Sequence, residues 1–126
     1  MLLRRALAAG LVLAALAIWF PRLADAHALV LESSPRADEV LRAAPARIFL
    51  RFNSRIEQAL SGITVTGPGG RPIPLPVVGA PEGAPNELSA PVPTLPPGRY
   101  LVRWKVLSAD GHVTQGALRF TVAPGP

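Results

Sequence analysis

The sequence contains no cysteine, and its single methionine is Met1. The absence of cysteine excludes disulfide bonds, thiolate metal sites and a cysteine nucleophile. The absence of any other methionine excludes thioether ligands, which soft metal ions prefer. Histidine is also scarce, because the chain has only two, His27 and His112. Among the side chains, these two imidazoles and the oxygen donors are the metal ligands that remain.

A hydrophobic run long enough to span a membrane is also absent. The uncharged stretch 6–20 has 15 residues, whereas a membrane-spanning helix needs about 20. Two arginines precede this stretch, and Ala24-Asp25-Ala26 follows it with the small-x-small pattern of a cleavage site. We therefore expect residues 1–26 to be a cleavable signal peptide and residues 27–126 to form one domain in the bacterial periplasm. The alternative is an uncleaved N-terminal anchor, for which the run is short.

The net charge of +5 is a weaker guide to partners than it first suggests. Removal of residues 1–26 discards three arginines and one aspartate, which leaves ten basic and seven acidic residues and a net charge of +3. The remaining basic residues alternate with apolar ones, as on the solvated face of a strand, and no row of aromatic residues accompanies them. We therefore expect a soluble mature domain that does not bind nucleic acid.

The pattern of the mature chain is that of an all-β domain. The full chain is 49% hydrophobic, which suits a packed core, and all of its 15 prolines except Pro21 lie in the mature chain, where they favour short strands and turns over long helices. Apolar and polar residues alternate between turn signals, which predicts strands at 28–31, 46–53, 62–66, 73–78, 87–89, 99–107 and 115–122. The prolines in 73–78 restrict that strand to a sheet edge, and residues 38–44 leave room for one helical turn at most. Six or seven strands predict two packed antiparallel sheets, an immunoglobulin-like β-sandwich.

One group of residues has the composition of a metal site. Asp110 and His112 lie two positions apart in the turn 108–112, so their side chains point to the same side if the segment is extended or bulged. Cleavage after Ala26 would give His27 a free α-amine beside its imidazole. Three nitrogens and one carboxylate oxygen fit Cu(II) best, with Ni(II) and Zn(II) less suited. Because these ligands bind when deprotonated, binding should weaken as the pH falls.

A reading without metal explains the same residues. A histidine at a mature N-terminus is usually only solvated, and Asp-Gly-His is often a simple turn in which the aspartate bonds the backbone and the glycine takes a positive φ. On spacing alone the two readings have about equal weight. A catalytic triad of Ser108, Asp110 and His112 is excluded, because residues this close in one turn cannot form the required relay. We expect no catalytic residues.

The whole mature chain resembles the CopC family of periplasmic copper-binding proteins. The opening residues 27–35, HALVLESSP, are similar to the family's N-terminal H-A-x-x-x-x-S-x-P, and residues 45–52, PARIFLRF, to its P-x-x-I-x-L-x-F. The most specific part runs from Pro97-Gly98-Arg99-Tyr100 to Asp110-Gly111-His112 and on to Phe120-Thr121-Val122. A match of this length and order is far stronger than any single motif within it.

The resemblance implies a seven-stranded Greek-key β-barrel or sandwich that binds Cu(II) at its N-terminal histidine. Carried over by position, His27 supplies amine and imidazole, and Asp110 and His112 complete the site. Family members act without catalysis as periplasmic copper carriers or buffers, often beside a CopD-type inner-membrane copper transporter. Two departures stand out. Some members have an acidic residue after the phenylalanine that matches Phe52, where this chain has Asn53. Others carry a methionine-rich loop for Cu(I), and this chain has no such loop.

Two other functions are compatible with the sequence. Copper monooxygenases also begin with a chelating histidine, although they generally use a second histidine and an axial aromatic residue, and Asp110 counts against that arrangement. An immunoglobulin-like interaction module that binds no metal is the other alternative.

Overall fold

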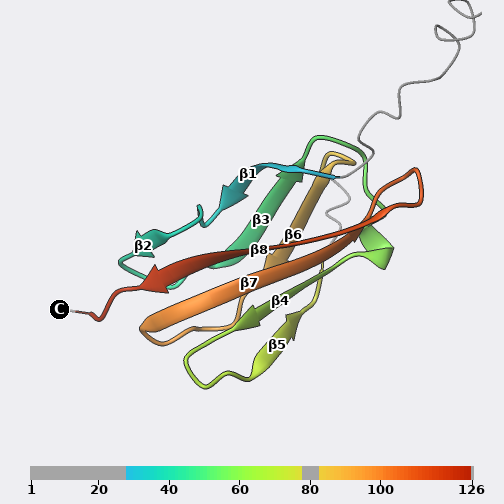
Figure 1. Cartoon of the computed structure of the whole chain (residues 1–126). Helices are drawn as coiled ribbons and strands as arrows, with labels where there is room; N and C mark the ends of the chain where they lie inside the picture. Colours follow the sequence, from blue (N-terminus) through green and yellow to red (C-terminus); the bar gives the residue numbers. More distant parts are fainter. Residues whose placement is uncertain (1–27, 78–82, 126) are drawn as a thin grey trace, which may run out of the picture.

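The computed structural model describes residues 28–77 and 83–125, which form a two-layer β-sandwich (Figure 1). The predicted signal peptide and His27 lie outside the described residues. Three strands form the smaller sheet: β1 (Val30–Ser34), β3 (Arg47–Phe52) and β6 (Glu87–Pro91). Five strands form the larger sheet: β2 (Glu39–Leu41), β4 (Gly62–Thr66), β5 (Pro72–Leu75), β7 (Gly98–Leu107) and β8 (Val113–Val122). One 3-10 turn, η1 (Gln58–Leu60), precedes β4.

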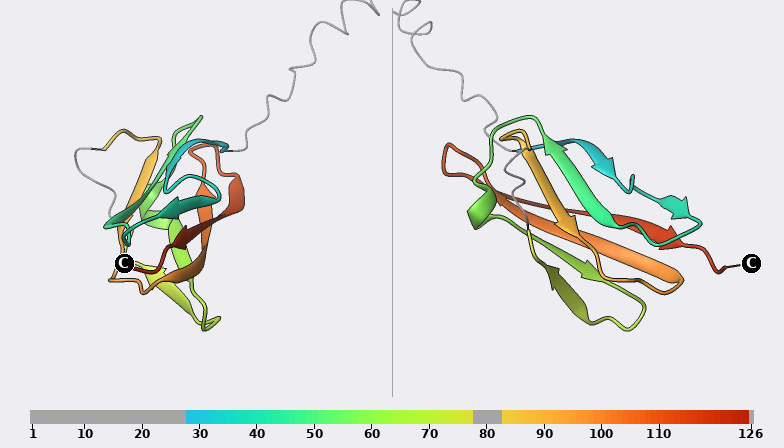
Figure 2. Two further views of the ribbon diagram at one scale, coloured as in Figure 1. Left: turned by 90° about the vertical axis from the view of Figure 1, so that its left-hand side faces the viewer. Right: turned by 180° about the vertical axis from the view of Figure 1, so that it is seen from behind.

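The two sheets pack face to face, as the views from the front and from behind show (Figures 1 and 2). The smaller sheet has the order β1-β3-β6, and the larger has the order β2-β8-β7-β4-β5. Neighbours in the sheets are often distant in sequence, which is consistent with Greek-key connections. The predicted all-β sandwich is therefore confirmed. No helix among the described residues is long and apolar enough to cross a membrane.

The core follows the alternation seen in the sequence. On β3 the side chains of Ile48, Leu50 and Phe52 are fully buried, while Arg47 on the opposite side is exposed. Successive residues of a strand face opposite sides, so each strand contributes one apolar face to the space between the sheets. The inward residues of β7 and β8 follow the same rule: Tyr100, Val102, Val106, Leu118, Phe120 and Val122.

The long hairpin of β7 and β8 is the main support of the larger sheet. Ten residue pairs join the two strands, from Gly98–Val122 to Leu107–Val113. Within it the indole of Trp104 lies across Gly116, where an added Cβ would fall 2.3 Å from the ring. Only glycine allows this close approach. The hairpin holds the turn 108–112 at one end of the sandwich.

Three details differ from the sequence expectations. Residues 38–44 contain no helical turn; instead β2 pairs in parallel with β8, with Glu39 beside Phe120, so the larger sheet is not wholly antiparallel. This short strand brings the described strands to eight, and β1 ends at Ser34, three residues past the end of the predicted strand 28–31. The edge position of β5 is confirmed, because β5 pairs only with β4.

Candidate metal centre

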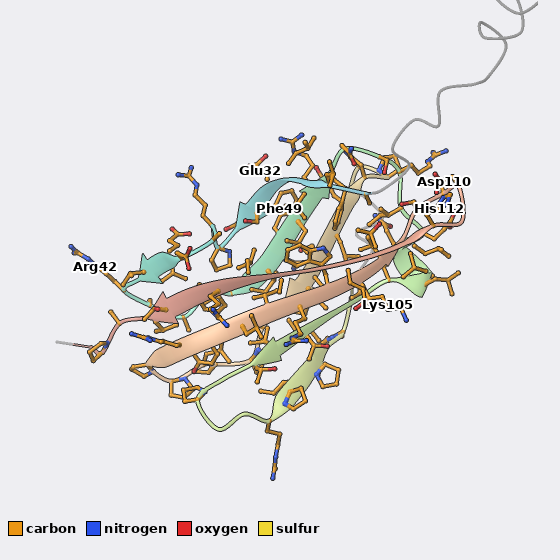
Figure 3. The ribbon with its side chains drawn as sticks, in the orientation of Figure 1. Glu32, Arg42, Phe49, Lys105, Asp110 and His112 are labelled. Carbon is orange, nitrogen blue, oxygen red and sulfur yellow. The ribbon has the colours of Figure 1, made fainter. Side chains whose placement is uncertain are left out.

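Residues 53–57, here called the bridging segment, connect the start of the described chain to the β7–β8 turn. At one end, the Leu29 amide donates to the Asn53 Oδ1 atom at 2.8 Å, and the Asn53 amide donates to the Leu29 carbonyl at 2.9 Å. At the other end, the Ala109 amide donates to the Arg55 carbonyl at 3.0 Å, and the Glu57 amide donates to the Leu107 carbonyl at 2.8 Å. The bridging segment therefore holds Leu29 and the turn 108–112 at the same end of the sandwich, and Figure 3 labels Asp110 and His112 of this turn.

The backbone next to His27 is firmly placed. Ala28 is only 2% exposed and belongs to the hydrophobic core. Asn53 then holds Leu29 through both its side chain and its main chain. Asn53, the residue after Phe52, thus restrains the chain two residues after His27. Its role was not predicted, because the partner is 24 residues away in sequence.

The turn 108–112 brings together two of the three predicted ligands. The Ser108 amide donates to the His112 carbonyl at 2.8 Å, and the Gly111 amide donates to the Ser108 carbonyl at 2.9 Å. Gly111 has a φ of +92°, which other residues rarely adopt. This closed backbone places the Asp110 Oδ1 atom 3.2 Å from the His112 Nδ1 atom. Asp110 and His112 therefore converge, as their spacing predicts.

The two side chains are accessible and electrostatically coupled. The side chain of His112 is 59% exposed and that of Asp110 is 44% exposed. The His112 amide donates to the Asp110 carboxylate at 3.2 Å, and this bond, aided by the His112 ring, lowers the pKa of Asp110. A lowered pKa keeps the carboxylate charged to a lower pH than an ordinary aspartate. Asp110 is thus an anionic oxygen donor throughout the neutral range.

The described residues do not form a metal site by themselves. Within 28–77 and 83–125, no three histidine, aspartate or glutamate side chains come close enough together to hold a metal ion. His27, the third predicted ligand, lies outside the described residues. The geometry of 108–112 also fits a simple turn without metal, since the Asp110 carboxylate accepts a backbone hydrogen bond and Gly111 has a positive φ. A complete site needs donors beyond Asp110 and His112.

The bond from Asn53 to Leu29 gives a first prediction. We expect Asn53→Ala to weaken metal binding by roughly 3- to 10-fold, because a hydrogen bond of this kind contributes about 0.5–1.5 kcal/mol to ordering the chain beside His27. Asn53→Asp keeps an oxygen acceptor for the Leu29 amide and adds the negative charge that some family members have here, so it should bind at least as tightly as the wild type. Cu(II) titration of both variants measures the effect. Equal affinity in Asn53→Ala and the wild type would show that this restraint does not act on the site.

The comparisons with known proteins agree on one family. The family model described as the CopC domain matches residues 30–123. Copper resistance protein C of Escherichia coli is 36% identical over 106 residues, covering 79% of this chain and 83% of that protein. Protein YobA of Escherichia coli K12 is 37% identical over 98 residues, covering 77% and 79%. The crystal structure of CopC from Methylosinus trichosporium OB3b superposes with a TM-score of 0.74 at 34% identity, covering 79% of this chain and 97% of that one. The chain belongs to the CopC family.

Proposed function

We propose that this protein is exported to the periplasm and binds one Cu(II) ion as a carrier or buffer in copper homeostasis and resistance. The observation that carries the proposal is the convergence of Asp110 and His112, 3.2 Å apart, at the end of the sandwich where the chain leaves His27. Ala28 and Leu29 are fixed at that end by burial and by Asn53. A chain beginning at His27 would therefore present its α-amine and imidazole close to the turn.

The donor set favours the oxidised ion. His27 would supply two nitrogens, His112 a third, and Asp110 a carboxylate oxygen whose lowered pKa keeps it charged to a lower pH than an ordinary aspartate. Nitrogen and oxygen donors in a tetragonal arrangement suit Cu(II), whereas Cu(I) is selected by thiolates and thioethers. The chain has no cysteine and no methionine besides Met1. Copper is the cargo in this proposal, and no catalytic step is assigned.

The relatives support the copper assignment through their names. A copper resistance protein C with 36% identity covers most of this chain, and a protein called CopC shares its fold. By the same family relationship we propose a CopD-type inner-membrane copper transporter as the partner that receives the ion. The exposed position of His112 and Asp110 suits such a transfer, because both side chains can be reached from solvent.

Titration of a chain that begins at His27 with Cu(II) tests the proposal. We expect one ion per chain at submicromolar affinity, equivalent to more than about 8 kcal/mol, with nitrogen hyperfine structure in the electron paramagnetic resonance spectrum. Binding should weaken as the pH falls, since protons compete for the nitrogen ligands. Failure to bind Cu(II) at micromolar concentration would favour the interaction module without metal. Oxidation of a polysaccharide by the copper-loaded protein with a reductant would favour the monooxygenase.

A further inference from the structure

The outer surface of the larger sheet carries four exposed cations on two adjacent strands. Arg99, Arg103 and Lys105 lie on β7, and Arg119 lies on β8. These four residues are here called the basic face. Their strand neighbours Tyr100, Val102 and Phe120 are buried in the core, so the alternation of the strands places all four cations on the solvent side. Figure 1 looks onto this side of the molecule, and Figure 3 labels Lys105 on it.

Little negative charge offsets the basic face. Among the described residues, the ion pairs are Arg51–Glu32 and His112–Asp110, and neither includes a residue of the basic face. The neighbouring strand β4 contains no acidic residue, and β2, on the other side of β8, contains Glu39, whose carboxylate accepts from the Arg36 amide. Asp38 is the one carboxylate that shares a hollow with these arginines. The four cations of the basic face outnumber these carboxylates, so the face keeps a net positive charge.

Two shallow hollows lie between the cations. One of about 410 Å³ is lined by Asp38, Arg103 and Arg119, and another of about 330 Å³ by Asp38, Arg99 and Arg119. The two share Arg119 and Asp38 and so adjoin, and in each of them two arginines face this one carboxylate. A guanidinium group offers several N–H donors in one plane, which match the oxygens of a phosphate. The geometry of the face is thus that of a surface for several phosphate groups.

We propose that the basic face binds the phosphate groups of an anionic lipid membrane. The cations extend along roughly 20 Å of β7, at about 3.3 Å per residue, and a row of this length on an open sheet fits an extended array of charges better than one small ligand. Each cation near an anionic bilayer contributes attraction that salt screens. The proposal rests on the proposed export, which would release the domain beside a membrane surface.

Binding by this face would leave the candidate metal centre accessible. Arg99 lies at the start of β7, whereas the turn with Asp110 and His112 follows the end of that strand. The separation is on the order of 30 Å at the rise of an extended strand. A domain held mainly through Arg99, Arg103 and Arg119 can therefore exchange copper at its other end while it stays at the membrane.

Sedimentation with lipid vesicles tests the proposal. We expect the chain 27–126, with or without copper, to bind vesicles of equal parts phosphatidylglycerol and phosphatidylcholine, and not vesicles of phosphatidylcholine alone. The triple variant Arg99→Gln, Arg103→Gln, Arg119→Gln should lower the partition constant by on the order of 100-fold. The matched control is Arg47→Gln, Arg55→Gln, Arg71→Gln, which removes the same charge from other parts of the surface and should lower it much less.

Three outcomes would overturn the proposal. They are equal losses in the two triple variants, no binding of the wild type to anionic vesicles, and capture of the wild type by soluble polyglutamate in preference to the vesicles. The last result would assign the face to an acidic protein segment. None of these outcomes depends on copper. The Cu(II) titration therefore tests the proposed function separately.

Discussion

His112→Ala should weaken Cu(II) binding by more than about 100-fold, because loss of residues that only support a metal ligand already costs 10- to 100-fold. His112 is the one histidine among the described residues, and its ring lies 3.2 Å from the Asp110 carboxylate. Titration with Cu(II) in competition with a chelator of known affinity gives the change directly. The electron paramagnetic resonance spectrum of the Cu(II) complex should also lose the hyperfine contribution of one nitrogen ligand.

The fold should survive this change, since the His112 side chain is 59% exposed and contributes nothing to the core. We expect the thermal unfolding midpoint of the copper-free variant to stay within about 2 °C of the wild type, as for an exposed substitution worth under 0.5 kcal/mol. Gln115→Ala, another exposed position on the same hairpin, is the matched control for copper binding. An affinity unchanged by His112→Ala would place the copper site elsewhere in the protein.

One extra residue in front of His27 should weaken Cu(II) binding by on the order of 100-fold or more. The extension converts the α-amine into an amide, which holds its proton and is a poor ligand at neutral pH, so at least one of the four proposed donors is lost. The His27 imidazole is retained, so the loss measures the amine together with the chelate that it forms with this imidazole. Isothermal titration of the two chains with Cu(II) compares them.

A chain with one extra residue after Pro126 is the matched control, because it has the same added length at the other terminus. It should bind Cu(II) like the chain 27–126. If both extended chains bind as tightly as the wild type, the amine is not a ligand, and the site would consist of side chains only. The role of His112 would still be tested separately by His112→Ala.

The sequence predicts best where a strand has one buried face. The alternation of Ile48, Leu50 and Phe52 predicts β3, because each of these side chains enters the core and the residues between them do not. The strand β2 was not predicted, because its three residues have no buried side chain and are positioned by pairing with β8, about 80 residues later. Leu41 alone among them packs against the core, and a strand of three residues is too short to show a period in its side chains.

The candidate site shows the same division. Asp110 and His112 belong to one turn, so their two-residue spacing was enough to predict that they converge. Asn53 approaches Leu29 from another strand end, and the basic face depends on the register that sets β7 beside β8. Both arise from contacts between distant segments, which spacing in a single sequence does not encode. The part of the site on His27 stays a prediction.

Native mass spectrometry of the exported protein, after addition of one equivalent of Cu(II), tests the proposed site most directly. The mass gives the first residue of the mature chain and the number of bound copper ions in one measurement. We predict a chain that begins at His27 and carries one copper ion. A mature chain that begins at any other residue and still binds one Cu(II) ion tightly would contradict a site built on the N-terminal histidine.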